Sequence, residues 1–262
     1  MNMTYTPLQL REIFHIESLR WFGRKMKAGS YAVKGGVNIR LFFKSARYSE
    51  DMDIDVEGVS VAAVKDAVMG VVAAPSFQNG LKSFGIERVG LPDMTKAKQT
   101  ETTQRFKIHL FTYTGEDLFT KIEFSRRGFS GPVVVEGIPD SVLRPYKVTP
   151  LLVPHYGITS AVSQKIGALA GRRVTQARDI FDLYVMSPQH NFTKFHGNIR
   201  EETFARAHER VLTVSFEEFR DTVVSYLAPD DIVSYTTADA WDIIKLKVAE
   251  YIEELRGYNV RP

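Results

Sequence analysis

The chain has no cysteine, so the sequence excludes disulfide bonds, thiolate metal sites and a catalytic thiol. No apolar run reaches the roughly 18 residues that a membrane-spanning helix needs, and the first residues lack the apolar segment of a signal peptide. The formal net charge is only +3, so the overall charge does not indicate nucleic-acid binding, although a local basic patch stays open. These absences predict a cytoplasmic protein that does not associate with a membrane.

The composition is that of an ordinary globular protein. The 262 residues suffice for one large domain or two small ones, with 44% hydrophobic and 25% charged residues. Strand-like alternation recurs in the first part of the chain, whereas helical periodicity dominates after Pro154. The sequence therefore predicts an α+β protein with a core domain over residues 1–152 and a mostly helical domain over residues 153–262.

Local signals predict several elements of the core domain. Thr6, Pro7 and Gln9 form a capping box and a proline start for a first helix, and Gly29 is a plausible end for it. Further elements are expected as a helix over residues 60–74, strands over 81–89, 105–113 and 118–125, and an edge strand at 133–135.

Three aspartates alternate with hydrophobic residues in the segment DMDIDV. If this segment is a strand, Asp51, Asp53 and Asp55 share one face while the intervening apolar residues face the core. Carboxylates this close repel each other unless a proton or a cation lies between them. Mg²⁺ prefers such oxygen ligands, usually one or two carboxylates together with substrate phosphates.

A glycine pair, Gly35-Gly36, precedes the acids. It follows the β-prone run 31–33 and precedes the helical-looking segment 37–43. Glycines at this position let a phosphate approach backbone N–H groups at the start of a helix. Alone, the pair also fits a tight turn and the acids a solvated strand edge. Because the acids lie on one face and only a short helix apart from the glycines, the combination favours phosphoryl or nucleotidyl transfer.

Two later groups of charged residues each allow a structural and a functional interpretation. Glu123 lies in the middle of an alternating strand, where it could form a salt bridge with Lys121 or Lys107. Farther on, Lys165 lies on one predicted helix and two acids, Asp179 and Asp182, on the next. From the residues alone, the second group fits an ion-pair network between two helices.

Four blocks of this sequence resemble the nucleotidyltransferase toxins of the AbiEii/AbiGii abortive-infection type, distant relatives of DNA polymerase β-like nucleotidyltransferases. The blocks are Lys34–Val37, Arg40–Phe42, Arg47–Asp53, and the pattern Lys165-x-x-Ala-Leu-x-x-Arg172 followed by Arg178-Asp-x-x-Asp-Leu183. The chain departs from the family in having Val37-Asn38 after the glycines, where Thr-Ala is more usual, and in the additional acid Asp55.

The resemblance implies a polymerase β-like core, with a mixed sheet flanked by helices, followed by a mostly helical domain. It also implies a divalent metal, Mg²⁺ or Mn²⁺, and an NTP substrate. The metal ligands would be Asp51, Asp53 and Glu123; the catalytic residues would be these three with Lys165 and Asp182; the nucleotide-binding residues would be Gly35, Gly36, Arg47, Ser49, Lys165 and Asp179. The sequence does not decide which of Asp179 and Asp182 is the functional acid.

The function that the resemblance implies is transfer of NMP from an NTP to an acceptor hydroxyl, with release of pyrophosphate. The acceptor expected from the family is the 3′ end of tRNA, and the protein would be a toxin of a toxin–antitoxin or phage-defence system with a cognate antitoxin as partner. Two alternatives stay open. One is nucleotidyl transfer to a Ser, Thr or Tyr of a protein, and the other is a non-catalytic nucleotide-binding module.

Overall fold

The computed structural model describes residues 5–95, 97–191, 195 and 199–259, and its contacts form two compact units. The first, the sheet unit, contains the chain up to Phe42 and Tyr48–Tyr156; the second, the helical unit, contains Phe43–Arg47 and the chain from Gly157. The predicted α+β class, a mixed sheet flanked by helices and followed by a mostly helical part, is confirmed by this arrangement. The domain limits at 152 and 153 stay a prediction, and the sequence did not indicate that residues 43–47 pack with the helical unit.

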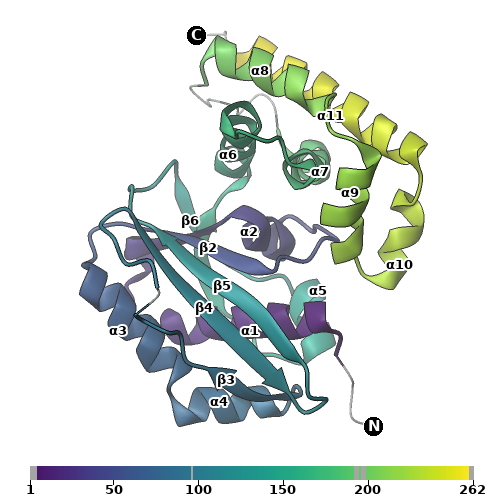
Figure 1. Cartoon of the computed structure of the whole chain (residues 1–262). Coiled ribbons are helices and arrows are strands. Elements are labelled where there is room, and N and C mark those ends of the chain that lie inside the picture. The colour runs from purple at the N-terminus through teal and green to yellow at the C-terminus, as the bar shows by residue number, and fades with distance from the viewer. Residues whose placement is uncertain (1–4, 96, 192–194, 196–198, 260–262) are drawn as a thin grey trace. The chain divides into compact units, whose positions relative to one another are not determined.

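A seven-stranded mixed sheet organises the sheet unit, with the strand order β3-β4-β5-β2-β1-β7-β6 (Figure 1). The β2–β5 and β1–β7 pairs are parallel and the other neighbours are antiparallel. The strands are β1 Tyr31–Lys34, β2 Asp51–Val56, β3 Ile86–Gly90, β4 Thr103–Thr112, β5 Asp117–Ser125, β6 Val133–Gly137 and β7 Leu152–Tyr156.

Helices α1, α3 and α4 pack together on one face of this sheet (Figure 1). The core contains the inward residues of β2, β4 and β5 and the apolar sides of the helices, among them Phe14, Met52, Ile54, Val68 and Phe124. The helices of the unit are α1 Pro7–Phe22, α2 Gly35–Phe42, α3 Val61–Val72, α4 Pro75–Lys82 and α5 Asp140–Leu143, with 3₁₀ turns η1 Ala28–Ser30 and η2 Arg144–Tyr146. The acidic face of β2 is the one that points away from this core.

The first helix begins as the sequence predicted and ends earlier. Thr6 and Gln9 form the expected capping box, and Pro7 is the first helical residue. The predicted end at Gly29 is wrong, because α1 ends at Phe22 and Gly29 lies in η1. Phe22 is the last buried residue of the apolar face, and residues 23–25 after it are exposed, so little burial favours another turn of helix.

Two strands differ from the sequence-based expectation. The segment predicted as a strand from residue 81 to 89 begins as the end of α4, because Pro75 starts a helix that buries Phe77 and Leu81 on one side, four residues apart. Strand β7 was missed, since it falls at the predicted domain boundary. It pairs with β1 and β6, and Asn38 of α2 fastens it by donating a hydrogen bond to the Tyr156 carbonyl at 2.9 Å.

The helical unit packs its helices around an aromatic centre. The Trp241 ring stacks on Phe219 with 4.2 Å between ring centroids, and its indole N–H donates to the Val214 carbonyl at 3.0 Å. The helices are α6 Ile158–Gly171, α7 Ala177–Met186, α8 Glu201–Val211, α9 Phe216–Thr222, α10 Pro229–Ile232 and α11 Ala238–Asn259, with 3₁₀ turns η3 Ser187–Gln189, η5 Val224–Tyr226 and η6 Val233–Tyr235. The mostly helical character expected for this part of the chain is confirmed.

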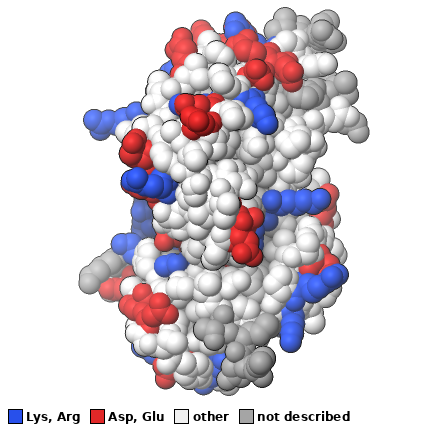
Figure 2. All heavy atoms as spheres, turned by 90° about the vertical axis from the view of Figure 1, so that its right-hand side faces the viewer, with Lys and Arg blue, Asp and Glu red and all other residues white. Residues whose placement is uncertain are grey.

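The surface and the helices agree with the ordinary composition. On the face shown in Figure 2, basic and acidic side chains are interspersed and neither sign forms one large field. Among the described residues, each helix is too short or too polar to cross a lipid bilayer.

A buried histidine fixes the chain just before β2. His15 of α1 lies with its Nε2 atom 2.9 Å from the Thr120 hydroxyl, and that hydroxyl donates to the Glu50 carbonyl at 2.6 Å. Because the single hydroxyl proton is used on Glu50, Nε2 carries the proton that it donates to Thr120. Burial, aided by the charge of Arg11, lowers the pKa of His15 from 6.5 to about 3, so the imidazole is neutral in the folded protein.

Replacing this histidine should flatten the dependence of stability on pH. Below pH 6.5 the unfolded chain protonates His15, whereas the folded protein does so only near its pKa of about 3. The histidine therefore stabilises the fold fully above 6.5, and this stabilisation is lost as the pH falls. Between about pH 7.5 and pH 5, wild type should lose about 2 kcal/mol more unfolding free energy than His15→Gln, measured by urea unfolding. Equal losses in the two proteins would contradict a neutral buried imidazole.

Candidate functional site

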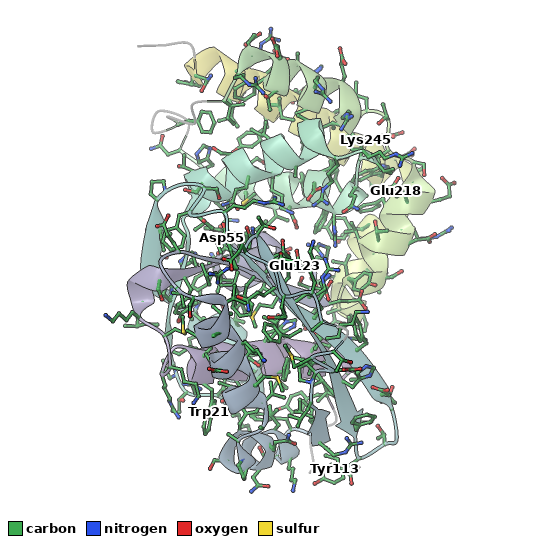
Figure 3. The ribbon with its side chains drawn as sticks, turned by 60° about the vertical axis from the view of Figure 1, so that its left-hand side comes forward. Trp21, Asp55, Tyr113, Glu123, Glu218 and Lys245 are labelled. Carbon is green, nitrogen blue, oxygen red and sulfur yellow. The ribbon has the colours of Figure 1, made fainter. Side chains whose placement is uncertain are left out.

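The three aspartates of β2 share the face that points away from the core, as the alternation predicted. Asp51 and Asp53 are half-buried, whereas Asp55 is buried. In the parallel β2–β5 pairing, Asp53 lies directly beside Glu123 and Asp51 beside Lys121. Asp55 and Glu123 are labelled in Figure 3, near one another on the two strands. The structure thus brings Asp51, Asp53 and Glu123, which the sequence predicted as metal ligands, onto one small patch of the sheet.

Asp51 and Glu123 are paired with basic side chains in this structure. The Lys121 ammonium lies 2.8 Å from Asp51, and the Arg105 guanidinium lies 2.7 Å from Glu123. The sequence suggested a salt bridge between Glu123 and either Lys121 or Lys107. The salt bridge is present, but its partner is Arg105. Both pairs are partly open to solvent, so each contributes little net stability. Another cation can therefore replace the lysine or arginine at little cost in free energy.

Asp53 differs from Asp51 and Glu123 because, among the described residues, it has no basic side chain within ion-pair distance. Burial raises its pKa, Glu123 and Asp51 raise it further by repulsion, and Lys34 and Lys121 act in the opposite direction. A carboxylate in this state is stabilised by any cation that approaches it.

The start of α2 lies directly against Asp53. Gly35 has a φ of +66°, and a Cβ atom placed on it would lie 3.0 Å from the Asp53 Oδ2 atom. The position therefore requires glycine both for its backbone conformation and for the space beside the carboxylate. Gly35 and Gly36 are the first two residues of the helix, instead of a turn before it, so their N–H groups belong to the unpaired end of α2.

Asp55 is held on both carboxylate oxygens. Lys34 lies 2.5 Å from Oδ1, and the Tyr156 hydroxyl donates to Oδ2 at 2.6 Å. Burial, with the hydrogen bond to Asp55 as the next cause, raises the pKa of Tyr156 to about 12, so this hydroxyl keeps its proton at neutral pH. These bonds join β1, β2 and β7 and leave Asp55, only 3% exposed, without an open oxygen.

The segment before β2 is anchored by contacts that the sequence did not reveal. Glu12 of α1 accepts from Arg40 of α2 at 2.6 Å and from the Tyr146 hydroxyl at 2.5 Å, and Arg40 lies over the Tyr48 ring at 4.2 Å. Only the presence of Arg40 in a family block hinted at this cluster. The next residue, Ser49, donates to the backbone carbonyl of Asp51 at 2.8 Å and so stabilises the start of the strand.

The second group of predicted residues forms one buried cluster inside the helical unit. Lys165 lies 2.8 Å from Asp179 and 2.6 Å from Asp182. Asp179 also binds Arg172 at 2.7 Å, and Asp182 binds Arg47 at 3.2 Å. The ion-pair network weighed from the sequence is therefore present. The Arg178 guanidinium donates to Gln176 instead, and it acts on Asp179 only through its charge.

The charges in this cluster hold one another in the ionised state. Burial alone would lower the pKa of Lys165, but the carboxylates of Asp179 and Asp182 outweigh it and raise that pKa. Burial opposes ionisation of Asp179 as well, yet Lys165 and Arg172 lower its pKa below the usual value. Lys165 is thus held as a charged ammonium that lies within ion-pair distance of both acids.

The family model described as nucleotidyl transferase AbiEii toxin of type IV toxin–antitoxin systems matches residues 21–253, which is most of the chain. The chain belongs to the AbiEii family. It is therefore a nucleotidyltransferase and the toxin of a type IV toxin–antitoxin system, which implies an NTP substrate and an antitoxin partner. No curated protein matches the sequence.

Solved structures share the AbiEii fold at low sequence identity. MenT4, a nucleotidyltransferase toxin from Mycobacterium tuberculosis H37Rv, aligns with a TM-score of 0.62 and 16% identity over 94% of this chain and 84% of its own. JHP933 from Helicobacter pylori aligns with a TM-score of 0.54 and 17% identity over 98% of this chain and 95% of its own. At these identities the likeness shows a shared fold and nothing further.

Adding a single methyl group at Gly35 should damage the site of this AbiEii protein. Gly35→Ala forces a side chain into a left-handed backbone conformation and against Asp53, so we expect a loss of about 1–3 kcal/mol in unfolding free energy. Gly29→Ala is the matched control. Gly29 lies in η1 just before β1, whereas Gly35 follows β1, and a Cβ added to Gly29 has nothing within 4 Å. Chemical denaturation of both variants measures the difference, and equal stabilities would refute the close approach at Gly35.

Removing the central lysine of the buried cluster should destabilise the protein in a pH-dependent manner. Lys165→Met leaves Asp179 and Asp182 with one basic partner each, and we expect a loss of about 3–5 kcal/mol near pH 7. Without the ammonium, the acids take up protons more readily, so the loss should shrink as the pH falls toward about 5. Urea unfolding at both pH values tests this, and a loss that is independent of pH would exclude uncompensated carboxylates as its cause.

Proposed function

We propose that this AbiEii toxin transfers NMP from an NTP to the 3′-terminal hydroxyl of a tRNA, in the cytoplasm and with Mg²⁺ or Mn²⁺ as cofactor. The observation that carries the proposal is the pairing of β2 with β5, which sets Asp53 beside Glu123 with Asp51 two residues away. Gly35, at the start of α2, lies directly against the Asp53 carboxylate. Carboxylates beside an anion-binding helix start are the requirements of nucleotidyl transfer.

The residues present fit a divalent metal of the hard type. All three candidate donors are carboxylates, and the repulsion that raises the pKa of Asp53 is what a bound cation relieves. In the described part of the chain, no group of three or more His, Cys, Asp or Glu side chains is already arranged around a metal position. Mg²⁺ does not need such a cage, because it commonly uses one or two carboxylates and completes its ligands with phosphate oxygens and water. When bound, it neutralises phosphate charge and lowers the pKa of a hydroxyl.

The chain's own residues would then divide the work. Backbone N–H groups of Gly35 and Gly36 would bind phosphate oxygens at the start of α2. The acceptor oxygen attacks the α-phosphorus, the bond to the departing pyrophosphate breaks, and Glu123 takes the hydroxyl proton. Asp51 and Asp53 would hold the metal with Glu123 as the third ligand, while Asp55 keeps β1 and β2 in place.

The remaining predicted residues keep the roles that the family resemblance implies. Ser49 is expected to bind nucleotide, although its hydroxyl here donates to Asp51. Arg47, Lys165, Asp179 and Asp182 belong to the helical unit, and their nucleotide-binding and catalytic roles stay predictions. The same holds for the part that this toxin would play in phage defence.

Labelling with nucleotides tests the proposal directly. The purified protein is incubated with total tRNA, Mg²⁺ and each NTP radiolabelled at the α-phosphate, beside Asp53→Asn and the control Asp66→Asn, which changes an exposed acid on α3. Wild type and Asp66→Asn should label tRNA equally, and Asp53→Asn should be slower by about 1,000-fold or more, because the carboxylate nearest to the glycine start loses its charge.

The other outcomes separate the alternatives. Label on protein instead of tRNA would favour the protein-modifying transferase. Nucleotide binding without label on any acceptor would favour the non-catalytic module. Labelling that is unaffected by Asp53→Asn or by chelation of the metal would overturn the mechanism proposed here.

A further inference from the structure

A strip of aromatic and basic side chains lies beside the acids, on the same outer face of the sheet. It consists of Phe119 and Lys121 on β5, Lys107, His109 and Phe111 on β4, and Arg88 on β3. We refer to these six residues as the outer strip. It belongs entirely to the sheet unit, and neither the family assignment nor the predicted site accounts for it.

The strand register fixes the order of this strip. Starting at the row that contains Asp53, Glu123 and Arg105, the next row along β5 pairs Lys121 with Lys107, and the one after it pairs Phe119 with His109. Phe111 follows on β4, with the Arg88 guanidinium 3.8 Å above its ring. Because residues two apart on a strand are about 7 Å apart, Phe119 is about 14 Å along β5 from Glu123. The strip thus leads directly away from the acids.

Contacts within the fold explain only part of this strip, such as the edge-on packing of Phe119 against His109, with 5.5 Å between the ring centroids. Phe119 keeps 41% of its surface exposed, although alternate residues of the same strand fill the core on the other face. Lys107 and Lys121 stand directly opposite each other, and like charges in that position destabilise a sheet. The negative charges on this face are few: Asp117 is paired with His109, Glu123 with Arg105, and Asp51 with Lys121. Phe119 has Lys121 on one side along β5, and the acid on its other side, Asp117, is paired with His109. An exposed ring next to two lysines is suited to a ligand that is both anionic and aromatic.

We propose that the outer strip binds the unpaired nucleotides that precede the acceptor hydroxyl of a single-stranded nucleic acid end, an inference that rests on the proposed function. Base faces stack on exposed aromatic rings, and lysine and arginine bind the phosphates between them. A duplex offers no free base face to Phe119, so the occupant is single-stranded. The terminal hydroxyl lies at Glu123, and the chain of nucleotides runs along β5 toward Phe119 and Phe111.

Binding of RNA to the full-length protein without NTP tests the strip apart from catalysis. The probe is a fluorescein-labelled single-stranded adenosine oligonucleotide, followed by anisotropy. Phe119→Ala should raise the Kd about 5- to 100-fold, and Phe119→Trp should restore binding, because a stacked base contributes about 1–3 kcal/mol. Lys107→Ala should reduce the slope of log Kd against log salt concentration by about 0.7.

Matched controls lie outside the strip. Tyr113 is an aromatic residue, 60% exposed, that directly follows β4 and lies farther from Glu123 than Phe119 does (Figure 3), and Lys65 is exposed on α3. Tyr113→Ala and Lys65→Ala should leave the Kd and the salt slope unchanged. If Phe119→Ala and Tyr113→Ala weaken binding equally, if duplex RNA binds as tightly as single strands, or if wild type does not bind the probe, the proposal is wrong.

The transferase assay separates failure of this inference from failure of the proposed function. If wild type labels tRNA and Phe119→Ala does so with an unchanged KM for tRNA, the strip is not the path of the acceptor and the function stands. If no acceptor is labelled although RNA binding depends on Phe119, the transferase proposal fails and the binding surface stands. If Phe119→Ala binds RNA normally but is no longer neutralised by the antitoxin, the strip is a protein-docking surface and the inference is overturned.

Discussion

The parallel pairing of β2 with β5 is the constraint on which the candidate site depends. It places Asp53 beside Glu123, although the two residues lie on strands that are far apart in sequence. The inward residues of the same strands, such as Ile54 and Phe124, are buried against the helices, so the strands cannot slip by one residue without exposing the core. The favourable free energy of burying these core residues therefore keeps Asp53 and Glu123 close together in spite of their repulsion.

Charge compensation differs between the site and the surrounding scaffold. At the candidate metal ligands the basic partners, Lys121 and Arg105, are partly exposed and exchangeable. Asp55, by contrast, is buried with both oxygens bound, and in the helical unit Lys165 is buried with Asp179 and Asp182 as partners. Breaking a buried pair is costly, whereas replacing an exposed one is cheap. The strong pairs thus fix the fold, and the weak pairs leave their carboxylates accessible to a ligand.

The sequence predicted those features that depend on local periodicity. The alternation of DMDIDV gave the shared face of the acids, and the first helix started at its capping box. Features that depend on distant residues were out of reach. Arg105 as the partner of Glu123 requires the β4–β5 register, the Glu12–Arg40 pair joins two helices, and β7 becomes a strand because β1 and β6 offer it edges. Roles assigned to the site residues rest on family resemblance and await the labelling experiment.

Asp51 and Asp55 show why periodicity alone cannot assign a chemical role. Both are two residues from Asp53 and lie on the same face of the same strand. Asp55 is flanked by β1 and reached by Tyr156 of the missed strand, so it is buried and its oxygens are saturated. Asp51 meets only the flexible end of Lys121 and remains half-exposed. The position of a residue in the sheet, more than its place in the motif, thus decides whether its carboxylate stabilises the fold or stays available for a metal.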